Sequence, residues 1–139
     1  MEQLTPFKAV QLLSERLPAL QQLFASDKRV LSVWLFGSLS DGYTSQRSDV
    51  DLAVLFDCAL DYREEADFDF QVRETLGADS VDVVCLNRAS LLLRFRAISG
   101  QLIYERDYTQ VSDFIEQTLS EYHDFAPRRA AMLRDYFRE

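Results

Sequence analysis

Several residue types are scarce in this chain of 139 residues, and each scarcity excludes a class of protein. The only histidine, His123, has no companion for a metal site or a catalytic triad, so we interpret it as structural or surface. The two cysteines, Cys58 and Cys85, sit in or beside apolar strand candidates rather than at metal-ligand spacing, which indicates two reduced thiols. With only four glycines and three prolines, the composition is that of a compact folded protein rather than a disordered one.

Basic residues are also few, and long hydrophobic runs are absent. Fifteen Lys and Arg face 23 Asp and Glu, a net charge of -8, which argues against a broad nucleic-acid surface because phosphate backbones require clustered cations. No apolar stretch approaches the ~20 residues of a membrane span, and the N-terminus carries no apolar signal region. We therefore expect one cytoplasmic domain with no direct nucleic-acid or membrane partner.

One stretch, Leu35 to Val54, carries most of the chemical information. It contains Gly37-Ser38, ten intervening residues and then Asp49-Val50-Asp51, which opens the apolar run Leu52–Phe56. Side chains alternate along a strand, so Asp49 and Asp51 are expected to project to the same side, where one divalent cation could bridge them. Two like charges this close are costly without a cation, which predicts a metal at the entrance of a buried strand.

The upstream half of this stretch has the features of a phosphate turn. The apolar strand candidate Val30–Phe36 ends at Gly37-Ser38, where glycine allows close backbone approach and serine supplies a hydroxyl. A short helix starting after Ser38 would direct free N–H groups at a phosphate. Arg47 is the nearest cation within the motif, either a phosphate or partner contact or a solvated loop charge.

Apolar periodicity predicts the remaining elements. Pro18 indicates a kink or break of the first helix near Leu17, and Gly77 is a natural helix terminator. The acids of residues 57–69 suit a solvated helix face, with a docking patch for a basic partner as the alternative. The expected elements are a helix over 4–25, a helix within 57–76, a strand over 80–86, a helix starting at Asn87 and ending at Ser99-Gly100, a short strand over 101–104 and a long helix from Tyr108 to near Pro127.

Asp82 lies within the valine-rich strand candidate SVDVVCL. An aspartate there is costly unless it has a partner, although it could instead cap the strand end or pair with an arginine. Asp79 is the competing candidate for a functional carboxylate at this strand, but its place before the strand better suits a turn.

The last 13 residues, 127–139, are rich in both apolar side chains and arginines. Pro127 can begin a new helix. A terminus of this composition either folds back on its own core or inserts into a partner groove as an amphipathic helix, and the sequence leaves both open.

The Gly-Ser pair, the ten-residue spacing and the segment SDVDLAV together resemble the signature of the DNA polymerase β-like nucleotidyltransferases. The short length and the later segments VDVVCLN and LIYERD are similar to the minimal nucleotidyltransferases, and more closely to the MntA-type antitoxins of HEPN/MNT toxin–antitoxin systems. The resemblance covers roughly residues 5 to 125. It implies an α+β nucleotidyltransferase fold, a small mixed sheet of about four strands flanked by helices, with residues 1–126 as the domain and 127–139 as a helical tail.

The resemblance also implies a site. Asp49, Asp51 and Asp82 would be the catalytic carboxylates and the ligands of two Mg²⁺ ions, with ATP as substrate. Gly37, Ser38 and Arg47 would bind the nucleotide. The chain departs from many relatives at Leu39 and Asp41, where arginine is frequent, so two cationic contacts to a triphosphate are missing.

The activity implied by the resemblance is transfer of AMP to a tyrosine of a cognate HEPN ribonuclease toxin, which silences the toxin within a hetero-oligomer. Two alternatives stay open. One is a non-catalytic antitoxin that acts by steric binding, and the other is a nucleotidyltransferase for a small molecule such as an antibiotic.

Overall fold

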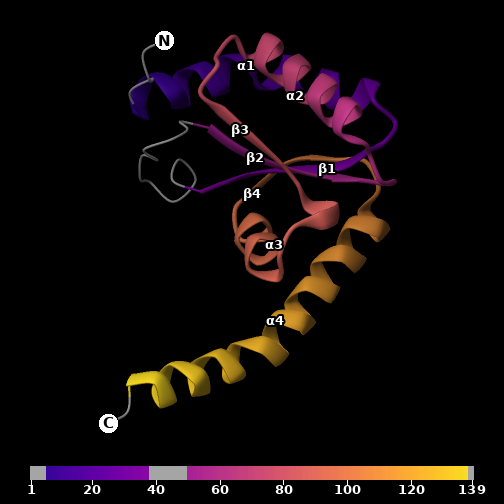
Figure 1. The fold of residues 1–139 in the computed structure, drawn as a ribbon. Helices are drawn as coiled ribbons and strands as arrows, with labels where there is room; N and C mark the ends of the chain where they lie inside the picture. The colour runs from indigo at the N-terminus through magenta and orange to yellow at the C-terminus, as the bar shows by residue number, and fades with distance from the viewer. Residues whose placement is uncertain (1–5, 38–49, 138–139) are drawn as a thin grey trace.

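A computed structural model describes residues 6–37 and 50–137 of the chain. Four strands and four α-helices, with one short 3₁₀ turn, make up these residues (Figure 1). In chain order they are α1 (Pro6–Ser26), β1 (Val30–Phe36), β2 (Val50–Phe56), α2 (Tyr62–Leu76), β3 (Val81–Cys85), η1 (Leu86–Arg88), α3 (Leu91–Ile98), β4 (Gln101–Glu105) and α4 (Tyr108–Phe137).

The four strands form one mixed sheet in the order β3-β2-β1-β4. β1 is antiparallel to both β2 and β4, whereas β2 and β3 are parallel and are joined by the crossover helix α2. Helices α1 and α2 cover one face of the sheet, and α3 and α4 lie on the other (Figure 1). The predicted α+β fold with a small mixed sheet flanked by helices is confirmed.

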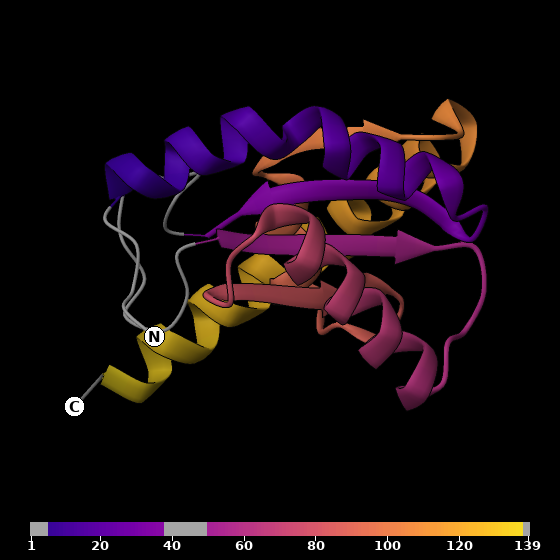
Figure 2. The ribbon, with the colours of Figure 1, turned by 90° about the horizontal axis from the view of Figure 1, so that it is seen from above.

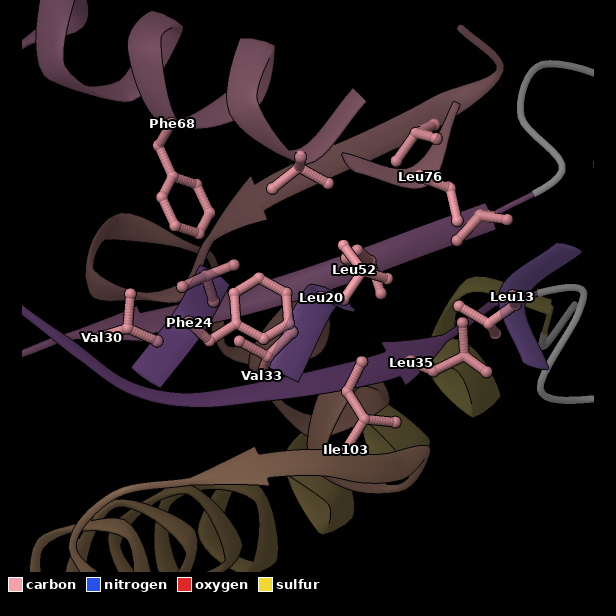
Figure 3. Close-up of a cluster of buried hydrophobic side chains, with 14 of the residues drawn as sticks. Leu13, Leu20, Phe24, Val30, Val33, Leu35, Leu52, Phe68, Leu76 and Ile103 are labelled. Carbon is pink, nitrogen blue, oxygen red and sulfur yellow. The ribbon is translucent and has the colours of Figure 1, made fainter. Parts of the chain in front are cut away.

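Two hydrophobic cores hold this arrangement together, one on each face of the sheet. Every residue of β1 and of β2 is buried, as the apolar run at Leu52–Phe56 predicts. The larger core joins the sheet to α1 and α2, and it includes the buried side chains labelled in Figure 3: Leu13, Leu20, Phe24, Val30, Val33, Leu35, Leu52, Phe68, Leu76 and Ile103. The smaller core joins the sheet to α3 and α4 and contains Trp34, whose predicted core position is confirmed at 2% exposure.

The sequence predicts a kink or a break near Leu17, and the break is wrong, because helix α1 continues through Pro18. The buried side chains Leu13, Leu20 and Phe24 lie on both sides of the proline and fix both halves of the helix on the same sheet face. The end of α1 is capped from a distance, because the guanidinium of Arg106 donates hydrogen bonds to the carbonyls of Phe24, Ala25 and Asp27 at 2.8–3.3 Å.

Helix α2 has a defined start and a defined end. Asp61 and Glu64 form a capping box at its N-terminus, and Gly77 ends it in a left-handed conformation with φ 76°, as predicted. Three of its acidic side chains form salt bridges with arginines of this chain. These pairs are Glu64 with Arg29, Glu65 with Arg88 and Asp69 with Arg73.

The segment after β3 differs from the sequence prediction, which started a helix at Asn87. Ser90 is the residue that caps α3, and its side chain accepts a hydrogen bond from the backbone N–H of Leu93. Asn87 instead lies in η1, where its amide group accepts from the N–H of Phe56 at 2.9 Å and donates to the carbonyl of Phe56 at 2.7 Å. Its side chain therefore substitutes for a neighbouring strand at the end of β2.

The sequence predicts that the long helix ends near Pro127, but α4 continues to Phe137, so this predicted end is wrong. Its first half packs on α3 and the sheet, and its last turns project away from the body of the domain (Figures 1 and 2). The described turns up to Phe137 thus extend from the domain instead of packing back on its core, and the insertion of residues 127–139 into a partner groove stays a prediction. Over the residues the structure describes, no helix is both long enough and apolar enough to cross a membrane.

Candidate active site

The sequence-predicted site lies at the end of the sheet where β1 ends and β2 and β3 begin. Asp51 is the second residue of β2. It is in register with Phe36 of β1 on one side and with Asp82 of β3 on the other. Two of the three predicted carboxylates are therefore on neighbouring strands at the same level of the sheet.

Asp51 and Asp82 project from the same face. Residues in register on adjacent strands share a face, and the backbones of neighbouring strands are about 4.8 Å apart. Two residues further along the strands, Ala53 and Val84 belong to the core on the α3 and α4 side, so the two aspartates point to that side as well. The parallel pairing of β2 with β3 thus brings together two acids that are 31 positions apart in the chain.

The two carboxylates differ in exposure. Asp51 is 9% exposed, whereas Asp82 is exposed because β3 is an edge strand of the sheet. The expectation that Asp82 bears the cost of a buried charge is therefore wrong. Its competitor, Asp79, lies outside the strand in the turn before β3, and its backbone carbonyl accepts a hydrogen bond from Arg73.

Gly37 lies directly against the Asp51 carboxylate. It has a left-handed φ of 79°, and a Cβ atom at this position would be 2.5 Å from Asp51 Oδ2, closer than real Cβ contacts allow. Glycine is required here both for the backbone conformation and for the space. The predicted phosphate turn and the predicted metal ligand are thus in contact at the end of β1.

Three predicted site residues, Ser38, Arg47 and Asp49, lie outside the described residues, as do Leu39, Asp41 and the short helix expected after Ser38. Within residues 6–37 and 50–137, no group of three or more His, Cys, Asp or Glu side chains could hold a metal ion. The pair that the structure does bring together, Asp51 and Asp82, presents carboxylate oxygens, the ligand type that Mg²⁺ prefers.

Sequence reasoning missed one residue that supports the site. It assigned Gly100 only to the end of a helix, but a Cβ atom there would be 2.3 Å from the carbonyl oxygen of Leu35 and 3.0 Å from the Cβ of Phe36. The turn between α3 and β4 therefore packs directly on the last residues of β1, one step before Gly37. No signal in the sequence indicates this close approach, because it depends on the pairing of β1 with β4.

The two thiols supply no ready nucleophile. A hydrogen bond with Asp57 raises the pKa of Cys58, and burial raises the pKa of Cys85, in both cases above the ordinary 9.0. Both cysteines are therefore protonated thiols at neutral pH, and neither is in a disulfide.

The comparison with known proteins places the chain in a family. The model of the polymerase beta nucleotidyltransferases matches residues 19–109, and the chain belongs to this nucleotidyltransferase family. The resemblance of its Gly-Ser and Asp-Val-Asp motif to that family is thus confirmed.

Three relatives narrow the comparison. The chain is 31% identical over 138 residues to the protein adenylyltransferase MntA of Shewanella oneidensis. The matched region covers 97% of this chain and 89% of the relative. It is 25% identical, with a TM-score of 0.64, to a chain in the crystal structure of a toxin–antitoxin with AMP-PNP, over 96% of this chain and 98% of that chain. It also shares the fold of a chain in the complex of a tri-AMPylated Shewanella oneidensis HEPN toxin with MNT antitoxin. The TM-score of that pair is 0.68 and the identity is 21%, over 88% of this chain and 97% of that chain.

Proposed function

We propose that this protein is an antitoxin that transfers AMP from ATP to a tyrosine of a cognate HEPN ribonuclease toxin and thereby silences it. The observation that carries the proposal is the register of Asp51 with Asp82 on one sheet face, with Gly37 packed against the Asp51 carboxylate. The similar protein from Shewanella oneidensis is a protein adenylyltransferase, and a similar toxin–antitoxin structure holds AMP-PNP, which supports ATP as the substrate.

The metal ligands proposed for this site are Asp51, Asp82 and, outside the described residues, Asp49. Two closely spaced carboxylates on one face repel each other unless a cation lies between them, and their hard oxygen donors fit Mg²⁺. Two bound Mg²⁺ ions would supply the positive charge that neutralises the triphosphate.

The phosphate side of the site is assigned to Gly37, Ser38 and Arg47. The left-handed backbone of Gly37 turns the chain sharply at the end of β1, beside the metal ligand. Backbone N–H groups in such a turn, with the Ser38 hydroxyl, would hold the β- and γ-phosphates, and Arg47 would add one positive charge.

In the proposed reaction, the tyrosine hydroxyl oxygen of the toxin attacks the α-phosphorus of ATP. The bond between that phosphorus and the oxygen bridging to the β-phosphate breaks, and pyrophosphate leaves. Asp82, which is exposed on the edge strand β3, would help to remove the hydroxyl proton.

The direct test is a transfer reaction with the purified chain, ATP, MgCl₂ and the cognate HEPN toxin, followed by mass spectrometry of the toxin. The wild-type chain should add one or more AMP groups to a tyrosine. Asp82→Asn should reduce transfer by at least 100-fold, whereas Asp79→Asn, three residues away and outside the sheet register, should transfer like the wild type. No adduct on a toxin that nevertheless binds the wild-type chain would refute the enzymatic proposal.

A second candidate is an antitoxin that blocks its toxin by contact alone. It is favoured by Leu39 and Asp41, which remove two cationic contacts that many relatives provide for the triphosphate. The same experiment separates the two, because steric inhibition predicts an inactive toxin of unchanged mass that recovers its ribonuclease activity when the complex is dissociated.

A further inference from the structure

The two halves of α4 differ in their surroundings. The first half is anchored: Val111 and Thr118 are fully buried, the rings of Tyr122 and Phe95 of α3 stack with centroids 3.7 Å apart, and Glu121 accepts a hydrogen bond from Arg94 at 2.9 Å. These contacts lock the helix axis onto the domain up to about residue 122. The direction of the second half is therefore set by the first, because the helix is continuous to Phe137.

The second half of α4 extends toward the end of the sheet that carries the candidate active site. In Figures 1 and 2 its last turns extend toward the end of the sheet at which β1 ends and β2 begins, and they do so on the side of the sheet that α3 and α4 occupy. Asp51 and Asp82 project from that same face at that same end. Of the side chains described in these turns, Phe125, Pro127, Arg128, Ala130 and Arg134 are all exposed.

The charge of these turns is opposite to that of the rest of the chain. Residues 127–139 contain four arginines and two acids, whereas the whole chain carries a net charge of -8. A basic segment on an otherwise acidic chain would attract an acidic surface on another molecule.

We propose that the projecting turns of α4, residues 127–137, form the docking surface for an acidic surface of the acceptor protein and hold that protein over the Asp51 and Asp82 face. The inference rests on the proposed function, since it takes the acceptor to be the HEPN toxin. A helix fixed to the domain loses little conformational freedom on binding, so it can position a partner relative to the carboxylates. The likeness to the chain of the toxin–antitoxin structure with AMP-PNP covers 96% of this chain, more than residues 1–126 alone could account for.

The test uses the full-length protein and a matched pair of double charge reversals. Arg128→Glu with Arg134→Glu changes two exposed arginines on the projecting turns, and Lys28→Glu with Arg63→Glu makes the same change of charge at exposed positions near α1 and α2. The affinity for the cognate HEPN toxin is measured by isothermal titration calorimetry at 50 and 300 mM NaCl.

The expected result is that the α4 variant binds the toxin at least about tenfold more weakly at 50 mM NaCl and loses most of the salt dependence of the wild type, while the control variant keeps both. Circular dichroism should show unchanged helix content and melting temperature for both variants. Equal affinities of the α4 variant and the wild type would overturn the docking inference.

Two further measurements keep this inference separate from the proposed function. If the wild type binds the toxin but transfers no AMP, the enzymatic proposal fails, while the affinity difference between the variants still decides the docking surface. Sedimentation velocity tests the other possible occupant of this surface, a second copy of this chain. If the wild type is a dimer, the α4 variant is a monomer and both bind the toxin with the same affinity, docking of the toxin is overturned.

Discussion

Substituting Gly37 by alanine tests whether the turn at the end of β1 positions the Asp51 carboxylate. The new Cβ atom would lie 2.5 Å from Asp51 Oδ2, and ordinary contact begins at 3.4 Å, so the carboxylate would have to move by about 0.9 Å. Displacements of about 1 Å in an active site can cost about 100-fold in rate. We therefore expect Gly37→Ala to lower AMP transfer by about two orders of magnitude.

A second glycine provides the matched control. Gly77 has nearly the same backbone conformation, φ 76° against 79°, but a Cβ atom added there would have Arg16 Nη2, at 4.0 Å, as its nearest heavy atom. Both substitutions should cost about 1–2 kcal/mol in free energy of unfolding, because alanine is strained in the left-handed region. Only Gly37→Ala adds a displacement of Asp51.

The assay combines urea unfolding of both variants with AMP transfer measured from radiolabelled ATP. Gly77→Ala should lose stability but transfer at nearly the wild-type rate below its unfolding transition, whereas Gly37→Ala should lose both. If the two variants transfer at the same rate, the contact between Gly37 and Asp51 does not position the carboxylate, and the geometry assigned to the site is wrong.

Three other predictions concern single side chains. Asn87→Ala removes both hydrogen bonds to the backbone of Phe56 and should lower the free energy of unfolding by about 2 kcal/mol in urea titrations, with a smaller loss for Asn87→Asp, which keeps an acceptor for the N–H of Phe56. Thr118→Val should be neutral or stabilising by up to about 1 kcal/mol in the same assay, because the buried Thr118 hydroxyl has no hydrogen-bond partner in the part of the chain that the structure describes. The hydrogen bond from Arg29 lowers the pKa of Asp27 below its usual 3.8. The stabilisation of the folded state by the ionised Asp27 is therefore complete well above pH 3.8 and is lost as the pH falls through the lowered pKa. The difference in free energy of unfolding between the wild type and Asp27→Asn should be widest near pH 6 and should close below pH 3.8.

The strands were predictable because their signal is local. Val30–Phe36 forms a strand with the bounds that the apolar run indicates, and the run after Asp51 lies in the central, fully buried β2. The Gly-Ser and Asp-Val-Asp motif likewise indicated the family, and the role proposed for Asp82 rests on that resemblance. The sequence could not show that β3 is an edge strand, and so it assigned to Asp82 a desolvation cost that an exposed side chain does not bear.

Two of the errors in the predicted helices arise at prolines. A proline inside a helix leaves the carbonyl four residues earlier without its usual donor, which for Pro18 and Pro127 is the carbonyl of Ser14 and of His123. Both of those residues are exposed, so water can bond the carbonyl and the helix continues. Whether a given turn faces water is decided by tertiary packing, which local periodicity does not contain.

The roles of Asn87 and Gly100 were out of reach for a related reason. Asn87 bonds to β2 and Gly100 packs on β1, contacts across 31 and about 64 positions of the chain. Each looks in the sequence like an ordinary helix boundary. Their functions in the fold follow only once the strand order is known.

The opposite directions of β1 and β2, and the shared direction of β2 and β3, also order the assembly of the site in time. Gly37 and Asp51 come together as soon as the β1–β2 hairpin closes, since Phe36 and Asp51 are already paired in that register. Asp82 arrives only after residues 57–80, with α2, have crossed over the sheet. Closing the longer connection costs more chain entropy, so the contact between Gly37 and Asp51 should form before Asp82 joins them. The pairing of β1 with β4, which joins Leu35 to Gln101, spans a still longer stretch of chain and should close last, so Asp51 and Asp82 come into register before the sheet is complete.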